Sequence, residues 1–338
     1  MNKILVIGPA WVGDMVMAQS LFQILKANAP LTAIDVLAPD WTRPLLDRMP
    51  EVQKAHAMPI GHGVLDLRRR YQLAQGLKSE GYTQAIVLPN SWKSALIPWW
   101  ATIPKRTGFL GECRFGLLND YRILNKKKLS RMIDRFAALA IEKNAPLPYP
   151  VPHPRLEVHV DSVHAAITKF SLAMDLEGPI LALCPGAEFG ASKRWPEQYY
   201  AEVALAKLKE GWAVWLFGSK KDEAQALAIQ IATGERCRDF TGKTNLSEAI
   251  DLMSLVRLVV TNDSGLMHIA AALQKPVVAV YGSTDPGFTP PLGANAHIVR
   301  LSLPCSPCFK RECPLQHHQC MQALLPERVL SAIHSMGH

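Results

Sequence analysis

The chain has 338 residues and a formal net charge of +8; 49% of its residues are hydrophobic and 20% are charged. This length favours two domains over a single hydrophobic core, and the composition excludes a mainly disordered chain. No run reaches the about eighteen uninterrupted apolar residues of a membrane-spanning helix, while the positive charge favours anionic partners such as nucleotides, nucleic acid or an acidic membrane surface.

The N-terminus runs directly into an apolar strand and a glycine-containing turn, without the small-residue cleavage site of a signal peptide. We therefore expect a cytoplasmic protein. Its seven cysteines are then expected to be reduced thiols, because an odd number argues against a framework of disulfides.

Short β-rich runs alternate with helical stretches along both halves of the chain. In the first half, strands are expected at 3–8, 32–37 and 84–88, and helices at 15–28, 64–80 and 129–144. In the second half, strands are expected at 180–184, 213–217, 258–262 and 277–281, and helices at 197–210, 220–233, 246–254, 265–273 and 326–334. Strands that alternate with helices are typical of parallel sheets, so the sequence predicts an α/β protein.

A proline-rich segment, 145–154, separates the two halves. Its prolines forbid helix and hold the backbone extended, as in a linker. We predict a domain at 1–150 and a second at 151–338, both Rossmann-like, facing a central cleft. Open α/β sheets bind ligands at the carboxyl ends of their strands, so the chemistry is expected there.

Asp14 follows the first predicted strand and its glycine turn, at the start of a helix. The turn has neither the G-x-G-x-x-G spacing of dinucleotide binders nor the Lys-Ser/Thr of a P-loop. Asp14 fits two roles from its position alone: a helix N-cap or a catalytic carboxylate.

Three segments of the second half combine strand ends, glycines and charges. The strand 258–262 leads through Asp263-Ser264-Gly265 into a small-residue helix that contains His268, an outline of an anion site. Ser192-Lys193-Arg194-Trp195 precedes another helix, an arrangement suited to pyrophosphate, although most lysines are merely solvated. Asp222 follows a further strand and glycine, where an acid binds ribose hydroxyls in comparable folds.

Together these motifs resemble those of glycosyltransferase family 9, the ADP-heptose:lipopolysaccharide heptosyltransferases. The resemblance rests on Gly13-Asp14, on 192–196, on 261–268 and on 281–286, and it runs along essentially the whole chain. It implies a GT-B architecture, with the acceptor on the first domain and the ADP-sugar on the second. It also implies inverting transfer of heptose from ADP-L-glycero-D-manno-heptose to the first heptose of heptosyl-Kdo2-lipid A.

The resemblance assigns roles to individual residues. Asp14 corresponds to the general base, and Lys193 to a lysine that binds the pyrophosphate. The implied donor site comprises Ser192, Trp195, Asp222, Thr244, Asp263, Ser264, Gly265, Leu266 and His268. A lysine, backbone N–H groups and a helix dipole can stabilise the departing diphosphate, so no cofactor is expected to be required, although a divalent cation could stimulate the reaction.

Two basic clusters lie on the predicted acceptor domain: Arg68-Arg69-Arg70, and Lys126-Lys127-Lys128 with Arg131 and Arg135. We expect Arg68, Arg69 and the three lysines to bind the anionic acceptor. They could also hold the anionic cytoplasmic face of the inner membrane, giving a peripheral association. For any one of these residues, a solvated helix face is the simpler interpretation.

Cys305, Cys308, Cys313 and Cys320, with His317 and His318, superficially suggest zinc. Only one Cys-x2-Cys pair is present, whereas structural zinc sites usually contain two. We therefore expect a reduced cysteine-rich loop at the cleft rather than a zinc site.

Three other functions remain open at this point. A nucleotide-binding oxidoreductase fits two Rossmann-like halves but lacks the dinucleotide motif. A basic, zinc-containing nucleic-acid-binding module fits the charge but lacks recognisable aromatic or helix-turn-helix motifs. Within the resemblance, transfer to Kdo instead of heptose is the third alternative.

Overall fold

The computed structural model describes residues 2–61 and 63–337, which form two compact units that divide between Arg155 and Leu156. The division follows the proline-rich segment 145–154. We call the two parts the N-terminal unit and the C-terminal unit.

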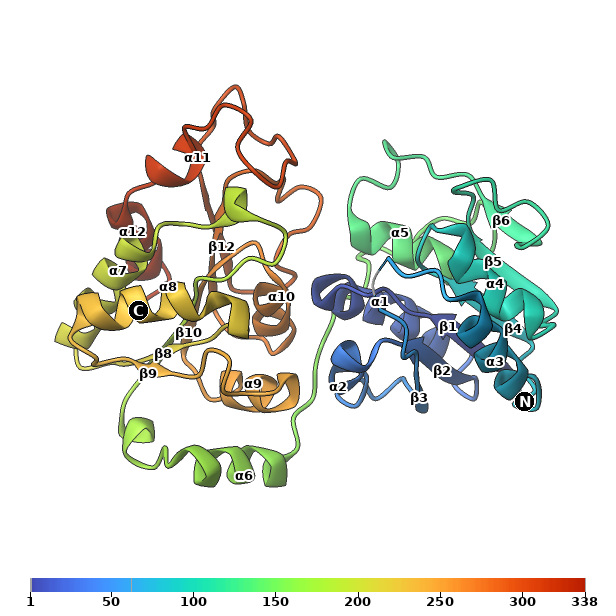
Figure 1. The fold of residues 1–338 in the computed structure, drawn as a ribbon, viewed down its shortest axis with the longest axis horizontal. Helices are drawn as coiled ribbons and strands as arrows, with labels where there is room; N and C mark the ends of the chain where they lie inside the picture. The colour runs from blue at the N-terminus through green and yellow to red at the C-terminus, as the bar shows by residue number, and fades with distance from the viewer. Residues whose placement is uncertain (1, 62, 338) are drawn as a thin grey trace. The chain divides into compact units, whose positions relative to one another are not determined.

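The N-terminal unit is built on one sheet of parallel strands in the order β3-β2-β1-β4-β5-β6 (Figure 1). The strands are β1 (Lys3–Ile7), β2 (Ala33–Ala38), β3 (Lys54–Ala57), β4 (Gln84–Val87), β5 (Lys105–Phe109) and β6 (Asp120–Arg122). The helices are α1 (Val12–Asn28), α2 (Arg43–Leu46), α3 (Leu67–Lys78), α4 (Trp92–Trp100) and α5 (Met132–Leu139), with a short 3-10 turn η1 (Asp40–Thr42). Helix α1 packs with α5, and α3 packs with α4, so the sheet is covered on both faces.

The C-terminal unit has a second parallel sheet in the order β12-β11-β10-β7-β8-β9. Its strands are β7 (Ile180–Cys184), β8 (Ala213–Leu216), β9 (Arg238–Asp239), β10 (Leu258–Asn262), β11 (Val277–Tyr281) and β12 (Ala296–Arg300). Its helices are α6 (Val160–Phe170), α7 (Glu197–Lys209), α8 (Glu223–Thr233), α9 (Leu246–Met253), α10 (Gly265–Ala272), α11 (Gln319–Gln322) and α12 (Pro326–Ser335), with 3-10 turns η2 (Met174–Glu177), η3 (Ala191–Lys193) and η4 (Lys220–Asp222).

Numbered within each unit, both sheets have the doubly wound order 3-2-1-4-5-6. In each, the first strand lies between the second and the fourth: β1 pairs with β2 and β4, and β7 pairs with β8 and β10. From β1 the chain continues to β2 on one side, and from β4 it continues to β5 on the other; β7 and β10 diverge in the same way. A crevice therefore opens between the loops that follow each pair of strands. This switch point is the expected ligand site of such a sheet.

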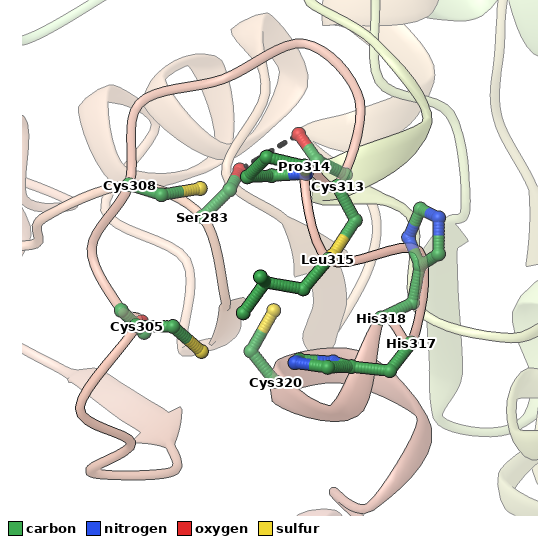
Figure 2. Close-up of a pocket in the computed structure, with 11 residues that line it drawn as sticks. Ser283, Cys305, Cys308, Cys313, Pro314, Leu315, His317, His318 and Cys320 are labelled. Carbon is green, nitrogen blue, oxygen red and sulfur yellow. Dashed lines mark hydrogen bonds between the residues drawn. The ribbon is translucent and has the colours of Figure 1, made fainter.

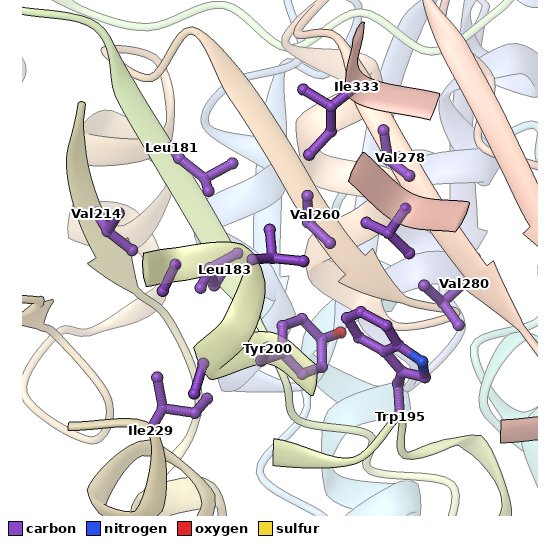
Figure 3. Packing of buried hydrophobic residues seen from close by; sticks show 14 of the residues in the cluster. Leu181, Leu183, Trp195, Tyr200, Val214, Ile229, Val260, Val278, Val280 and Ile333 are labelled. Carbon is purple, nitrogen blue, oxygen red and sulfur yellow. The ribbon is translucent and has the colours of Figure 1, made fainter. Parts of the chain in front are cut away.

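The strands around the C-terminal switch point are buried over their whole length, because helices cover both faces. On one face, aliphatic residues of β7, β8, β10 and β11 pack against Trp195, Tyr200, Ile229 and Ile333 (Figure 3). Helix α12 contributes Ile333 and contacts α7, β11 and β12, which settles that the C-terminal helix packs on the C-terminal unit. Burial of these side chains gives the loops at the switch point a rigid base.

The structure confirms the α/β class and the two Rossmann-like parallel sheets. Five strands were not predicted: the edge strands β3, β6, β9 and β12, and β5, which lies between β4 and β6. They are short or polar, and β5 (KRTGF) has neither the apolar run nor the strict alternation of a typical strand. The predicted helix at 129–144 is wrong in extent, because α5 covers only Met132–Leu139. In the part of the chain that the structure describes, no helix is both long and apolar enough to cross a bilayer.

Candidate functional site

An ion pair lies at the switch point of the C-terminal unit. Lys193 ends η3 in the loop after β7, and its Nζ is 2.6 Å from Oδ2 of Asp263, which directly follows β10. The Thr284 hydroxyl donates to the same carboxylate oxygen at 2.6 Å. The side chains of Lys193 and Asp263 are only 13% and 5% exposed. Two loops that are 70 residues apart in sequence are thus joined by a nearly buried, charge-assisted contact.

Asn262 holds the same two loops together, and sequence analysis missed it. Its Oδ1 accepts from the Trp195 backbone N–H at 3.1 Å and from the Tyr200 hydroxyl at 3.0 Å, while its Nδ2 donates to the Pro185 carbonyl at 2.6 Å. The side chain is fully buried. An amide at the last position of an otherwise apolar strand was the available signal, because such a group must be hydrogen-bonded when buried.

The start of α10 offers backbone N–H groups next to this ion pair. Ser264 is the N-cap residue, without a side-chain bond to the helix, and the run Ser264–Leu266 is partly exposed. The first N–H groups of a helix have no partner within it, so they can bind an anion. Gly265 begins the helix, where the lack of a side chain leaves room for such an approach.

His268 lies one turn into α10 and is 5% exposed. Burial lowers its pKa from 6.5 to about 4, despite the opposing influence of Asp263. The imidazole is therefore neutral at neutral pH, so it does not add a positive charge to an anion site. Any contact that it makes with a ligand is that of a neutral hydrogen-bonding group.

Asp222 ends η4 in the loop after β8, and its carboxylate lies against Gly186 in the loop after β7. Its Oδ2 accepts from the Ser219 backbone N–H at 2.9 Å and from the Ser219 hydroxyl at 2.7 Å, closing a capping box. A Cβ at Gly186 would overlap this carboxylate, so glycine permits the close approach. Thr244, also predicted in the donor site, is partly buried and bonds to the Phe240 carbonyl at 3.4 Å.

Trp195 differs from the role expected for it. Its indole is 1% exposed, donates to the Leu324 carbonyl at 2.7 Å and packs edge-to-face on Tyr200. Here the ring is a core residue (Figure 3). Its backbone, through Asn262, is what links it to the switch point.

The cysteine-containing segment 303–320 braces the Lys193 loop. The Ser192 backbone N–H donates to the Arg311 carbonyl at 3.1 Å, and the Ser192 hydroxyl bonds to Ser283 at 3.0 Å and to the Lys310 carbonyl. A Cβ at Gly190 would collide with the Arg311 backbone. Ser192 therefore positions its neighbour Lys193 through contacts with this segment, rather than facing open solvent.

Cys305, Cys308, Cys313, Cys320 and both histidines line one small cavity beside Ser192 and Ser283 (Figure 2). All four thiols are free. Backbone N–H groups, first that of His318, lower the pKa of the Cys313 thiol, whereas burial and the neighbouring thiols raise that of Cys320. Within residues 2–61 and 63–337, no three histidine, cysteine or acidic side chains converge as a metal-binding group.

Asp14 lies in the N-terminal unit, in the first turn of α1. The N-cap residue is Trp11, so Asp14 is the third residue of the helix and not its N-cap. Its side chain is partly buried and has interactions with its surroundings. The helix follows β1 at the switch point with β4, so the carboxylate belongs to the carboxyl edge of this sheet.

The predicted basic clusters divide into solvent-facing and structural residues. Arg68, Arg69 and Lys126–Lys128 are exposed. Arg70 is buried, and its guanidinium donates to the Leu65 carbonyl at 2.6 Å and to the Val64 carbonyl at 3.0 Å. Arg131 pairs with Asp134 at 2.8 Å, and Arg135 donates to the Leu129 carbonyl at 3.0 Å. The inclusion of Arg70 in the predicted basic cluster is therefore wrong, because its buried guanidinium is hydrogen-bonded to loop carbonyls and does not face solvent.

The sequence profile of glycosyltransferase family 9 (heptosyltransferase) matches residues 70–319. The chain is 47% identical to lipopolysaccharide heptosyltransferase 2 of Salmonella typhimurium, covering 99% of this chain and 98% of that protein. It is 51% identical to lipooligosaccharide heptosyltransferase 2 of Haemophilus influenzae over 88% of each chain. Among solved structures, ADP-heptose lps heptosyltransferase II of E. coli superposes with a TM-score of 0.88 at 44% identity, over 99% of this chain and 98% of that one.

Profile and relatives agree over most of the sequence, and the solved relative has the same two-sheet GT-B architecture. The chain therefore belongs to glycosyltransferase family 9, the heptosyltransferase family.

Proposed function

We propose that this glycosyltransferase moves L-glycero-D-manno-heptose from its ADP derivative to the first heptose of the lipopolysaccharide inner core, with inversion at the anomeric carbon. The observation that carries the proposal is the Lys193–Asp263 pair at the switch point, in a chain 47% identical along its length to a lipopolysaccharide heptosyltransferase 2. The same similarity favours heptose over Kdo as the acceptor sugar.

The C-terminal unit supplies what a nucleoside diphosphate requires. Lys193 is a nearly buried cation paired with Asp263 of a second loop, and the N–H groups of Ser264–Leu266 lie at the start of α10. An anion bound there gains from the ammonium group and from the helix dipole. Asp222 lies beside Gly186 and is the acid available for ribose hydroxyls.

In the transfer step, the acceptor hydroxyl oxygen attacks the anomeric carbon while the bond from that carbon to the β-phosphate oxygen breaks. ADP leaves with the electron pair, and the hydroxyl proton passes to the Asp14 carboxylate. One base suffices, since inversion needs no covalent sugar–enzyme intermediate. Lys193 and the α10 N–H groups stabilise the charge that develops on the departing diphosphate.

The same groups make a divalent cation dispensable for the chemical step. We expect activity to survive exhaustive treatment with EDTA, since the leaving diphosphate is stabilised by protein groups. Complete loss of activity that magnesium restores would contradict this account. Elemental analysis of the purified protein, performed alongside, tests for zinc at the Cys305–Cys320 segment.

The acceptor is an anionic lipid, which fits exposed cations on the N-terminal unit. Arg68, Arg69 and Lys126–Lys128 are the solvent-facing members of the predicted clusters. Their charges suit Kdo carboxylates, lipid A phosphates and an acidic lipid surface. We therefore place the enzyme peripherally on the cytoplasmic face of the inner membrane.

Mass spectrometry of the reaction product tests the proposal. Incubation with ADP-heptose and heptosyl-Kdo2-lipid A should increase the acceptor mass by one heptose. Kdo2-lipid A without heptose is the control: its preferential conversion would favour the alternative transfer to Kdo. A fluorescence change on titration with NADH would favour an oxidoreductase instead.

A further inference from the structure

An apolar and aromatic surface lies at the edge of the N-terminal sheet. Strand β6 is the last strand of the sheet order, so within the described residues one of its edges has no neighbouring strand. Phe115 is 62% exposed, Tyr121 37% and Ile123 81%. The rings of Phe115 and Tyr121 meet edge-to-face with their centroids 5.8 Å apart, which joins the loop after β5 to β6. Large apolar side chains grouped at this exposure indicate an interaction surface.

Arg122 explains why its neighbours are presented to solvent. Its side chain is buried and donates to the Ala138 carbonyl and, at 2.6 Å, to the Ile141 carbonyl, at the end of α5. Successive side chains of a strand point in opposite directions. Anchoring Arg122 against α5 therefore directs Tyr121 and Ile123 away from that helix.

Four lysines accompany these apolar side chains: three exposed lysines follow Ile123 closely in the chain, and a fourth contacts the Tyr121 ring. The Asn125 side chain accepts from the backbone N–H groups of Lys127 and Lys128 at 3.0 and 3.1 Å, and this turn presents Lys126, Lys127 and Lys128 to solvent. Among the described residues, none of these three forms an ion pair. Lys143 adds a further cation over the Tyr121 ring, 5.4 Å from its centroid.

The nearest acid on β6 does not neutralise this charge. The Asp120 carboxylate accepts from the Thr107 hydroxyl at 2.8 Å and lies 3.5 Å from the Arg122 guanidinium and 3.8 Å from Lys105. It is thus engaged on the Arg122 side of the strand. The Tyr121 and Ile123 side chains lie on the opposite side of the strand, where Lys143 contacts the Tyr121 ring.

We propose that this surface, the β6 patch (Phe115, Tyr121, Ile123, Lys126, Lys127, Lys128 and Lys143), docks the protein on an anionic phospholipid bilayer. Aromatic and aliphatic side chains enter the interfacial region of a bilayer, and lysines beside them bind acidic headgroups. A soluble anion would need only the cations and would leave Phe115 and Ile123 unexplained. The proposal rests on the proposed function and deepens it, because that function names exposed cations for the lipid surface but no apolar side chains that enter the bilayer.

Binding to vesicles without any acceptor tests the β6 patch directly. The full-length protein is sedimented with vesicles of phosphatidylglycerol and phosphatidylcholine, and with vesicles of phosphatidylcholine alone. We expect binding to the anionic vesicles only. The double variant Phe115→Ser/Ile123→Ser should weaken this binding by about ten-fold or more. Replacing Lys126–Lys128 with Gln should weaken it similarly and reduce its salt dependence.

A matched control comes from the C-terminal unit. Leu227 and Ile231 lie one turn apart on α8 and are 60% and 68% exposed. Leu227→Ser/Ile231→Ser removes comparable exposed apolar surface and should leave vesicle binding unchanged. Equal losses in both double variants would overturn the proposal, as would equal binding to vesicles of phosphatidylcholine alone.

Activity separates this proposal from the proposed function. With the acceptor dissolved in detergent, Phe115→Ser/Ile123→Ser should transfer heptose at the wild-type rate, since neither residue belongs to the donor or acceptor sites. A wild-type protein that is active in detergent but does not bind anionic vesicles would refute the membrane-docking role of the β6 patch and leave the proposed function standing. Vesicle binding without heptose transfer would refute the function and leave the surface standing. Thermal melts of all variants confirm that they are folded.

Discussion

The two units have the same strand order but differ at the carboxyl edge of their sheets. In the C-terminal unit, Asn262, Lys193 and Asp263 are buried or nearly so and bonded to each other's loops. In the N-terminal unit, the corresponding loops carry exposed tryptophans, among them Trp11, which is 40% exposed, and Trp92, also 40% exposed. The edge of the C-terminal sheet is therefore preorganised without a ligand, whereas the edge of the N-terminal sheet exposes aromatic side chains.

This difference fits the two substrates proposed for them. A nucleoside diphosphate is small, so a preorganised set of buried donors can surround it without a cost for ordering loops. A lipid-linked oligosaccharide is large and remains partly in the membrane, so an open edge with cations and aromatic groups suits it. Under the proposed function, the same fold would serve two kinds of recognition through differences in its loops.

Asp14→Asn is the strongest test of the chemistry assigned to the open edge. Because asparagine cannot accept the proton, kcat should fall by about 10²–10⁴ while ADP-heptose affinity stays unchanged. Steady-state rates and calorimetry measure both. Asp40→Asn, an exposed acid in η1 after β2, is the control and should retain activity. A near-wild-type rate for Asp14→Asn would return Asp14 to a helix-terminus role and direct the search for a base to Glu188 or another acid.

Lys193→Ala tests the preorganised edge. Loss of a charge-assisted contact of about 1.5–3 kcal/mol should weaken ADP-heptose binding by about ten- to a hundred-fold. Isothermal calorimetry measures the affinity. Thermal melting checks that the variant still folds, because the nearly buried Asp263 carboxylate loses its ion-pair partner. The control is Lys221→Ala: the Lys221 side chain is 71% exposed in the same unit, and this variant should bind ADP-heptose with wild-type affinity. Unchanged affinity in Lys193→Ala would remove this lysine from the donor site.

Replacing Lys126, Lys127 and Lys128 together with glutamine tests the division of labour between the units. We expect the acceptor KM to rise about ten-fold and its dependence on salt to weaken, since three cations no longer face an anionic lipid. ADP-heptose affinity should not change. Donor binding that suffers as much as acceptor binding would show that the two units do not act separately.

A smaller effect concerns the stability of the C-terminal unit against pH. Burial keeps the His268 pKa at about 4 in the folded state, against 6.5 when unfolded. Between these values the unfolded chain binds the extra proton, so stability should fall as the pH drops from 6.5 towards 4. His268→Gln should reduce this slope in urea unfolding at pH 7 and pH 5. The control His334→Gln, at an exposed histidine, should keep the wild-type slope; an unchanged slope in His268→Gln would contradict the assignment.

Hydrophobic patterning alone determined the α/β class, the two halves and the central strands. Strands 180–184, 258–262 and 277–281 were predicted with the observed bounds, because a buried parallel strand is a continuous apolar run. Turn chemistry likewise located Asp14, Lys193 and Asp263 at strand ends. These signals are local, so a single sequence carries them.

Only the tertiary structure decided which of these residues work together and which are structural. Trp195 and Arg70 have side chains typical of binding sites, but packing made one a core ring and the other a loop anchor. Asn262 joins loops from distant parts of the chain, and β6 became an edge strand only through the strand order. Burial and pairing depend on contacts between segments far apart in sequence, and local patterns do not encode those contacts.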